Sequence, residues 1–452
     1  GTTSYTYDDL KRVLTVTQPN GAVTTNTYDD NGNLTATTDN LNNTTHYEYD
    51  ALGRVIKTTD PLGNFTENFY DDAGRLVQTK DARGNATTYA YDDAGKQTSV
   101  TDALGNVTSY EYDDLGRRTA VIDAAGNRTE YTYDALDRVV TVTDPLGHTV
   151  STVYDALGQV TQRTDANGNS VSFGYDTLGR TTSQTDAMGN ISYFVYNEVG
   201  NRVSTTDPRG SVTTITYDEL NRPVVTTDPL GRSNTTTYNA AGQVSAVTNA
   251  NQETTSYTYN SLGQQATVTD AIGNVTQYQY DSLGRMTLMI DANGVATSYE
   301  YDDLGRLTAV TENYKAAFSP DDETNVRTEY TYDENGNRLT ITDGRGEITT
   351  FTYDELNRLL TETDALGNTW SYAYNELGQR MSMTDANGVV TQYEYDDASR
   401  LTTIDYANDS DVAFAYDAGG RRTSMSDGVG TTSWVYDNLN RPTEITDPFG
   451  ST

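Results

Sequence analysis

Short stretches of alternating apolar and polar residues, separated by turn residues, follow one another along the whole chain. Within such a stretch, Tyr110 and Tyr112 fall on one face of an extended strand and Glu111 falls on the other. A second kind of stretch, Arg-Val-Val-Thr-Val-Thr at residues 138–143, is rich in residues that favour strands. Gly, Asn or Pro bounds every stretch, and no window keeps a helical period. The pattern predicts an all-β chain.

A tyrosine recurs every 21 residues and divides the chain into repeats. The phase holds from Tyr7 to Tyr301, resumes at Tyr332 after one insertion, and ends at Tyr436, which comes one residue early. A fixed period of this length is typical of repeat architectures. In most repeats a second aromatic residue stands two places before this signature tyrosine. We therefore expect neighbouring hairpins to stack a double ladder of aromatic rings on one face of a sheet.

Each repeat contains two predicted turns with the same residue pattern, usually Asp at the first place and Gly at the fourth. The first turn follows the signature tyrosine, as in Asp-Asp-Leu-Gly at residues 113–116. The second turn lies between two signature tyrosines, as in Asp-Pro-Leu-Gly at residues 60–63. The leading Asp can bond the backbone two residues on, and Gly adopts a positive φ without a Cβ clash. Four-residue loops of this kind connect β-hairpins.

Two strands in each of 21 repeats give 42 strands, which limits the architecture. An antiparallel strip of 42 strands, each of seven or eight residues, would be roughly 200 Å long and about 25 Å wide. Sheets rarely exceed about ten strands without curling or closing. We therefore predict tandem hairpins of about 21 residues in a long antiparallel sheet that spirals into a hollow shell or tube. A narrow β-solenoid, roughly 100 Å long with one coil per repeat, also accommodates two turns per repeat, although the hairpin loops favour the strip.

The composition narrows the class of protein and of partner. Only 35% of residues are hydrophobic, yet 35 tyrosines can supply buried area while their hydroxyls stay bonded. A formal charge of −35 repels nucleic acid and anionic membranes, so we expect no nucleic-acid partner. No apolar run approaches the length of a membrane span, so we expect no membrane insertion by this segment. Cysteine is absent, which excludes disulfides and thiolate metal sites.

One insertion interrupts the repeat. Tyr301 and Tyr332 are 31 residues apart, so ten residues are added, within 312–323. Insertions in repeat proteins form loops on one surface, and we interpret this one as a surface loop. We expect residues 1–452 to form a single repeat array, and because the sequence stops in the middle of a repeat, we expect it to be a fragment of a longer chain.

The tandem motif Tyr-Asp-x-x-Gly-Arg, followed by Thr-Asp-x-x-Gly-Asn-x-Thr-x-Tyr-x-Tyr-Asp, resembles the YD repeat of Rhs proteins, bacterial toxin-complex shells, wall-associated proteins and animal teneurins. The resemblance covers essentially the whole chain. It implies a secreted or surface protein whose hairpin strip winds around a hollow chamber, which in the bacterial toxins holds a C-terminal toxin domain. No segment like the family's self-cleaving closure is present, since residues 447–450 fall where an ordinary second turn belongs.

The repeated polar residues are interpreted as structural. The Asp after the signature tyrosine could ligate calcium, but Asn replaces it at positions 197, 239, 260 and 375 and starts a turn equally well. The Arg five places after the tyrosine is expected to pair with carboxylates of adjacent hairpins and to fix the register. The repeat signature is carried by Tyr28, Asp29, Gly32, Tyr49, Asp50, Gly53, Arg54, Tyr112, Asp113, Gly116, Arg117, Tyr133 and Asp134.

No residue pattern points to catalysis. The two histidines, His46 and His148, occupy repeat positions that other residues fill elsewhere, and neither has a cluster of partners in the sequence. We therefore expect no enzyme activity, no catalytic residues, no metal and no cofactor.

The sequence thus predicts a non-enzymatic structural scaffold, located outside the cell or on the cell surface of a bacterium. In the resembled family such a β-shell encapsulates or displays a toxin or cargo domain, so the expected partners are a cargo or toxin domain or neighbouring repeat chains. The alternative is an extracellular structural or adhesive fibre built from the same repeats.

Overall fold

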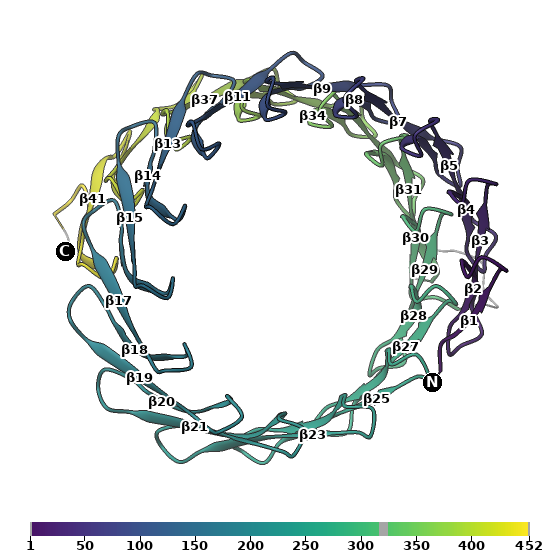
Figure 1. The fold of residues 1–452 in the computed structure, drawn as a ribbon, viewed down its shortest axis with the longest axis horizontal. Helices are drawn as coiled ribbons and strands as arrows, with labels where there is room; N and C mark the ends of the chain where they lie inside the picture. The colour runs from purple at the N-terminus through teal and green to yellow at the C-terminus, as the bar shows by residue number, and fades with distance from the viewer. Residues whose placement is uncertain (1, 316–323, 451–452) are drawn as a thin grey trace. The chain divides into compact units, whose positions relative to one another are not determined.

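Strand-forming residues between Asp- or Asn-led turns build, in the part of the chain that the structure describes, a sheet of 42 strands in antiparallel pairs, each of at most seven residues. The computed structural model describes residues 2–315 and 324–450, in which no helix is present. Consecutive strands succeed one another along the sheet (Figure 1). The antiparallel hairpin strip is confirmed, and the solenoid alternative is excluded. Strands of seven or eight residues were expected, but most have five or six, because the turns take up the other positions of the repeat.

The two strands of a repeat differ in where they begin and end. The 21 odd-numbered strands all end at a signature tyrosine: β1 (Ser4–Tyr7), β3 (Val23–Tyr28), β5 (Thr44–Tyr49), β7 (Phe65–Tyr70), β9 (Ala86–Tyr91), β11 (Val107–Tyr112), β13 (Arg128–Tyr133), β15 (Thr149–Tyr154), β17 (Ser170–Tyr175), β19 (Ile191–Tyr196), β21 (Val212–Tyr217), β23 (Ser233–Tyr238), β25 (Thr254–Tyr259), β27 (Val275–Tyr280), β29 (Ala296–Tyr301), β31 (Val326–Tyr332), β33 (Ile348–Tyr353), β35 (Thr369–Tyr374), β37 (Val390–Tyr395), β39 (Val412–Tyr416) and β41 (Gly430–Tyr436).

The even-numbered strands follow the first turns: β2 (Val13–Thr17), β4 (Leu34–Thr38), β6 (Val55–Thr59), β8 (Leu76–Lys80), β10 (Gln97–Thr101), β12 (Arg118–Ile122), β14 (Val139–Thr143), β16 (Val160–Thr164), β18 (Thr181–Thr185), β20 (Arg202–Thr206), β22 (Pro223–Thr227), β24 (Val244–Thr248), β26 (Gln265–Thr269), β28 (Met286–Ile290), β30 (Leu307–Glu312), β32 (Arg338–Thr342), β34 (Leu359–Thr363), β36 (Arg380–Thr384), β38 (Leu401–Tyr406), β40 (Arg422–Asp427) and β42 (Pro442–Thr446).

Pairing is longer across the first turn than across the second. Across the first turn, β3 and β4 pair from Thr25↔Thr38 to Tyr28↔Leu34, with a β-bulge just before the tyrosine. Across the second turn, β2 and β3 share only three residue pairs, ending at Thr15↔Thr25. The last three residues of an odd strand therefore have no ladder partner on the preceding even strand. A gap opens there between successive hairpins, at the edge of the strip that carries the first turns.

The sheet has almost no conventional core. Within the described residues the buried hydrophobic side chains are Ala36, Ala120, Ala309 and Phe351. The accessible surface is 25793 Å², against about 17,000 Å² expected of a compact monomer of this mass. In β11, Tyr110 and Tyr112 are half-buried and Glu111 is exposed, as the alternation predicts. Stability must therefore come chiefly from the ladder and from side chains that bridge neighbouring strands.

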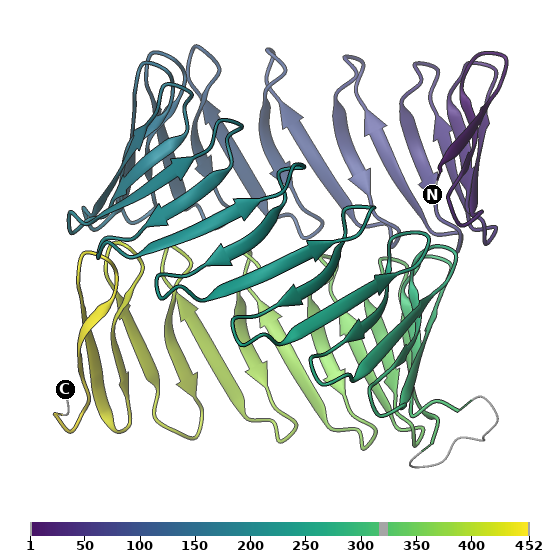
Figure 2. The ribbon, with the colours of Figure 1, turned by 90° about the horizontal axis from the view of Figure 1, so that it is seen from below.

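The chain divides into two units. Unit 1 comprises Gly1–Tyr89, Asp102–Leu104 and Asn234–Asn368, and unit 2 comprises Ala90–Thr101, Gly105–Ser233 and Thr369–Thr452. Each unit thus contains an early run of hairpins and a later run. In both units the later run lies edge to edge with the early run, second turns of the early run facing first turns of the later one. We call this line of turn-to-turn contacts the seam; in Figure 2 the turns lie along the edges of each strip.

In unit 1, the third residues of the turns make the seam contacts. The Nδ2 of Asn20 donates to the Ser282 carbonyl at 3.1 Å. Arg83 donates to the Asp333 carboxylate at 3.3 Å and to the Asp354 carbonyl at 2.8 Å.

In unit 2, the same turn position carries the seam. The Gly419 N–H donates to Oδ1 of Asn167 at 3.0 Å. Met188 lies 3.7 Å from Nη2 of Arg441.

The insertion departs from the regular repeat. β30 and β31 lengthen so that Glu312 pairs with Val326. The side chain of Asn325 bonds both the N–H and the carbonyl of Lys315, which ties the base of the added segment together. Residues 316–323 of the loop expected at 312–323 lie outside the described residues.

Candidate functional site

The aspartate that leads each first turn holds the turn closed. Oδ1 of Asp50 accepts hydrogen bonds from the N–H groups of Leu52 (2.9 Å) and Arg54 (3.0 Å). The Gly53 N–H donates to the Asp50 carbonyl at 3.0 Å, with Gly53 at φ +75°. An aspartate or asparagine bonding its own backbone two residues on is an Asx turn, and glycine supplies the positive φ that the fourth position requires.

The other signature aspartates occupy the same geometry. Asp29, Asp113 and Asp134 each accept from the N–H groups two and four residues on, at 2.8–3.1 Å. Gly32 and Gly116 adopt positive φ like Gly53, whereas Asp137 takes that role after Asp134.

These hydrogen bonds favour the charged form of the carboxylates. The N–H of Arg54, followed by its guanidinium, lowers the pKa of Asp50. The N–H of Arg117 has the largest effect in lowering the pKa of Asp113, and for Asp134 the Arg138 guanidinium has the largest effect. These three carboxylates are thus turn caps that stay ionised at neutral pH.

The arginine at the end of the first turn links one hairpin to the next. Nε of Arg117 donates to Asp113 in its own turn at 2.7 Å, and Nη1 donates to the Asp134 carbonyl of the following repeat at 3.2 Å. Its Cζ lies 4.9 Å from the centre of the Tyr133 ring, within cation–π range. We expected pairing with carboxylates of adjacent hairpins. Arg117 makes such a pair with Asp137 of the next first turn at 2.8 Å. It also bonds a carboxylate of its own turn, and it reaches the neighbouring hairpin through a carbonyl and a ring as well.

The hydroxyl of the signature tyrosine closes the gap between hairpins. Tyr28 donates to the Val13 carbonyl at 2.9 Å, and Tyr49 donates to the Leu34 carbonyl at 2.8 Å. In both cases the acceptor is the first residue of the preceding even strand, next to the bulge. The same bond recurs for Tyr70, Tyr112, Tyr133, Tyr154, Tyr175, Tyr196, Tyr217, Tyr259, Tyr280, Tyr301, Tyr332, Tyr353, Tyr395, Tyr416 and Tyr436.

The side chains that stack on the signature tyrosines therefore differ from the expected ones, which were other aromatic rings. A cation lies over the ring where a second ring was expected: Arg12 over Tyr28 at 4.6 Å, and Lys96 over Tyr112 at 5.4 Å. Burial raises the pKa of Tyr301 and Tyr353, which keeps these phenols protonated as donors. We call the Asp, Arg and following Tyr that meet in this way the clamp.

In several clamps both charged residues are replaced together: asparagine stands for the aspartate and glutamine for the arginine. Nδ2 of Asn239 donates to Gln243 at 3.0 Å, and Nδ2 of Asn260 donates to Gln264 at 2.8 Å. Gln243 also reaches the next hairpin by donating to the Gly263 carbonyl at 2.7 Å. The clamp thus keeps its connectivity without charge, which is the behaviour of a structural element rather than of a binding site for a charged ligand.

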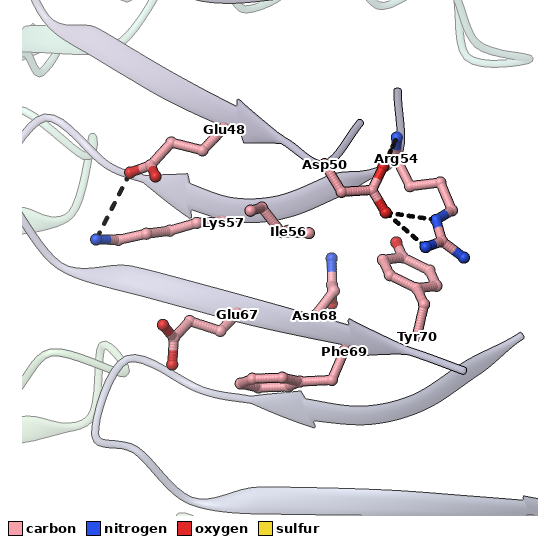
Figure 3. A pocket seen from close by; sticks show the side chains of 9 residues that line it. All are labelled: Glu48, Asp50, Arg54, Ile56, Lys57, Glu67, Asn68, Phe69 and Tyr70. Atoms are coloured by element: carbon pink, nitrogen blue, oxygen red, sulfur yellow. Dashed lines mark hydrogen bonds and ion pairs between the residues drawn. The ribbon is translucent and has the colours of Figure 1, made fainter. Parts of the chain in front are cut away.

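A groove opens where β6 and β7 separate, and Figure 3 shows its lining residues. It measures about 440 Å³ and is lined by Glu48, Asp50, Arg54, Ile56, Lys57, Glu67, Asn68, Phe69 and Tyr70. At one end lies the clamp of Asp50, Arg54 and Tyr70, and at the other Lys57 lies 3.7 Å from Glu48. The groove is a consequence of the three-pair register, because pairing stops at Lys57↔Glu67.

The remaining candidate features are the histidine of one second turn, metal-ligand clusters and membrane-spanning helices. Nδ1 of His148 lies 3.0 Å from Asp144 within a second turn, where it takes the place of the usual Asn. No group of three or more His, Cys, Asp or Glu that could hold a metal is found in residues 2–315 and 324–450. In the same residues no helix that could cross a membrane is found.

Known proteins share this sequence pattern and this fold. The profile of the teneurin YD-shell family matches residues 1–151, 66–222 and 293–452, and the RHS repeat profile matches residues 238–271 and 259–296. Among curated protein sequences, none matches the chain.

Three solved structures illustrate the similarity of fold. They are the crystal structure of TcdB2-TccC3 (16% identity, TM-score 0.79), that of TcdB2-TccC3 without its hypervariable C-terminal region (15%, 0.75), and the Photorhabdus luminescens Tc holotoxin pore with the mutation TccC3-D651A (14%, 0.50). Each covers 97–99% of this chain, whereas the match spans only 29–32% of the solved chains. At this level of identity the match establishes the fold.

Proposed function

The chain belongs to the teneurin YD-shell family, and from that we propose that it is a structural scaffold: a segment of β-sheet wall that encloses or displays a toxin or cargo domain, without enzyme activity of its own. The partners are a cargo or toxin domain or neighbouring repeat chains. Residues 1–452 act as one repeat array.

The seam is the observation that carries this proposal. In each unit, runs of hairpins some 250 residues apart in sequence meet turn to turn, and the contacts include a half-buried ion pair, Arg83 with Asp333. Two runs that meet turn to turn in this way form a continuous wall across the seam, which is what an enclosing layer requires. The repetition of the clamp along the strip supports a structural role for it.

The location that fits this function is outside the cell or on its surface, in a bacterium. The fold of the Photorhabdus luminescens Tc holotoxin pore supports a bacterial source. The absence of cysteine and the charge of −35 suit a soluble extracellular scaffold.

Cryo-electron microscopy of the isolated chain, without imposed symmetry, tests the scaffold. The expected particle has a wall one sheet thick around a solvent-filled interior. A compact particle, or a flat sheet with no interior, would contradict the proposal.

Enclosure needs a second measurement. A small reporter domain fused to the C-terminus should be digested by protease more slowly than in the double variant Arg83→Ala/Asn167→Ala, which removes contacts in both parts of the seam. Equal digestion rates would argue against enclosure while leaving the wall itself in place.

An extracellular fibre is the second candidate function. The observation that favours it is a set of exposed leucines on the turns that lie away from the seam.

A further inference from the structure

Six asparagines of the described chain stand directly before a glycine, at the third and fourth places of a turn. In this pair of residues the asparagine side chain reacts most readily with the backbone, because glycine has no Cβ to hinder the approach. The six are Asn20, Asn31, Asn167, Asn293, Asn335 and Asn387.

The reaction open to these pairs is deamidation through a cyclic imide. The backbone nitrogen of the glycine loses its proton and bonds to Cγ of the asparagine, while the bond from Cγ to the amide nitrogen breaks and ammonia leaves. Water then opens the ring at either carbonyl, which gives aspartate or isoaspartate. The net change takes up one water, releases one ammonia and turns a neutral amide into a carboxylate.

Two of these asparagines are held across the seam, one in each unit. In unit 1, Nδ2 of Asn335 donates to the Asp81 carboxylate at 2.6 Å. In unit 2, Oδ1 of Asn167 accepts from the Gly419 N–H at 3.0 Å, and its Nδ2 donates to Asp417 at 3.4 Å. Both asparagines are half-buried. While these bonds hold the amide, Cγ is not free to turn towards the backbone nitrogen that must attack it.

Two other asparagines have the same turn but stand away from the seam. Asn31 matches Asn335, since in both first turns the glycine N–H donates to the carbonyl of the leading Asp at 3.1 Å. Asn293 matches Asn167, and in both second turns the corresponding bond is 3.0 Å long. Asn31 and Asn293 are exposed. Each pair therefore holds the attacking nitrogen alike and differs in the surroundings of the side chain. Asn20 bonds across the seam but is exposed, so it belongs to neither group.

We propose that Asn335 and Asn167 are sites of spontaneous deamidation that the closed seam protects, and that their conversion keeps the seam from closing again. Each side chain reacts only while the seam around it is open, so its rate follows the open fraction.

The product changes the charge inside the seam. A new carboxylate at position 335 takes the place of an amide that donates to Asp81, and one at position 167 lies beside Asp417. Two carboxylates that share a site repel each other. Isoaspartate also adds one carbon to the backbone of the turn. Because hydrolysis of the amide is irreversible, the seam ages in one direction.

The first test compares rates within the intact chain. The whole chain is incubated at mildly alkaline pH, and tandem mass spectrometry follows the conversion of amide to acid at each asparagine. Asn31 and Asn293 should convert first. Asn335 and Asn167 should convert at least about tenfold more slowly, as expected of a seam that is open for no more than about a tenth of the time.

Two substitutions loosen the seam beside one asparagine without changing it. Arg83→Ala removes the ion pair of the unit 1 seam and should accelerate the conversion of Asn335 about fivefold or more. Gly419→Ala brings a Cβ against Nδ2 of Asn167 and should accelerate Asn167 in the same way. Each variant is the control for the other unit, and the two exposed asparagines should keep their rates in both.

The effect of the product is tested with Asn335→Asp and Asn167→Asp, which place the carboxylate in the seam from the start. Hydrogen exchange should become faster in the facing turn, at residues 81–84 in the first variant and 417–420 in the second. Asn293→Asp makes the same change of charge away from the seam, and it should leave both turns unchanged.

Equal conversion rates at seam and exposed asparagines would overturn the protection, and so would rates at Asn335 and Asn167 that the two loosening substitutions leave unchanged. Unchanged exchange in both aspartate variants would overturn the effect on closure. These measurements concern the seam alone, whereas the scaffold function is judged by the interior of the particle, so the two failures are distinguishable.

Discussion

At the scale of single residues, the chain replaces a hydrophobic core with hydrogen bonds placed where the ladder stops. The bulge before each signature tyrosine and the three-pair register leave a carbonyl at the start of each even strand, and the phenol of the next repeat supplies its donor. A tyrosine suits this place because its ring spans the gap and its hydroxyl still reaches the acceptor.

Removing one such hydroxyl should loosen one hairpin contact. Tyr175 donates to the Val160 carbonyl at 2.7 Å, so Tyr175→Phe should cost about 0.5–1.5 kcal/mol in the opening free energy of β16 and β17. Hydrogen exchange of those strands measures it. Tyr193→Phe is the control, since that side chain is about half exposed on the other face, and it should leave exchange unchanged.

The first-turn aspartates make stability depend on pH with a defined sign. Backbone N–H groups of Arg54, Arg75 and Arg117 are the largest cause of the lowered pKa of Asp50, Asp71 and Asp113, whose ordinary value is 3.8. Between the two pKa values the unfolded chain binds more protons than the folded chain. The stabilisation is therefore complete above about pH 3.8 and is lost as pH falls through the lower folded values.

The variant Asp50→Asn/Asp71→Asn/Asp113→Asn isolates this effect from the change in overall charge. Asparagine keeps the turn, as Asn239 does by accepting from Ala241 and Gln243 at 2.9 and 3.0 Å, but it cannot titrate. The difference in thermal midpoint between wild type and variant should shrink as pH falls from 7 to 3. A difference that stays constant over that range would refute the linkage.

At the scale of elements, the clamp sets how one hairpin meets the next. Arg180 bonds Asp176 at 2.7 Å and the Asn197 carbonyl at 3.1 Å, and its Cζ lies 4.9 Å from the Tyr196 ring. One residue thus fixes its own turn and the position of the following strand.

The natural Asn–Gln clamps indicate that the two polar partners are coupled. Asp176→Asn or Arg180→Gln alone should each lower the thermal midpoint by roughly 1–3 °C, because each leaves a charged group opposite an amide. The double variant recreates the pair seen at Asn375 and Gln379, 2.6 Å apart, and should recover most of the loss. Strictly additive effects in this double-mutant cycle would show that the pair acts independently.

The turns, the strands and the all-β class were predictable because each depends on residues within one repeat. Asp50 and Gly53 specify their turn locally, and the alternation around Tyr112 specifies its face. The contacts of Arg117 with the Asp134 carbonyl and the Tyr133 ring were not predictable, since they depend on the bulge and on the shortened register, neither of which is visible in the hydrophobic pattern. The seam role of Arg83 and Asn167 was missed as well. These contacts join turns about 250 residues apart, and nothing within one repeat marks them.

At the scale of the whole molecule, each unit is held by the seam between its two runs. Arg83 is the test case in unit 1: its side chain is 20% exposed and that of its partner Asp333 is 9% exposed. Such a pair is intermediate between surface and buried ion pairs, so breaking it leaves a poorly solvated carboxylate.

Arg83→Ala should therefore weaken the seam of unit 1 by on the order of 1–3 kcal/mol. Amides of the turns at residues 81–84 and 333–336 should exchange faster, and those far along the strip should not. Arg209→Ala is the matched control, because Arg209 fills the same turn position but is exposed. Equal effects of the two substitutions would show that turn composition, and not the seam contact, governs exchange.

The sequence separation of the seam contacts also determines how long a nascent chain waits before its seam can form. Each hairpin pairs with its neighbours in sequence, so it can form within microseconds of leaving the ribosome. Asn20 and Ser282 are 262 residues apart, and at about 5–20 residues per second the partner turn emerges roughly 13 to 50 seconds later. During that interval the early second turns have no seam partner, so the growing chain exposes a turn edge that pairs only after its own later synthesis. Translation speed, more than any folding barrier within a hairpin, then decides how long this protein is vulnerable to aggregation.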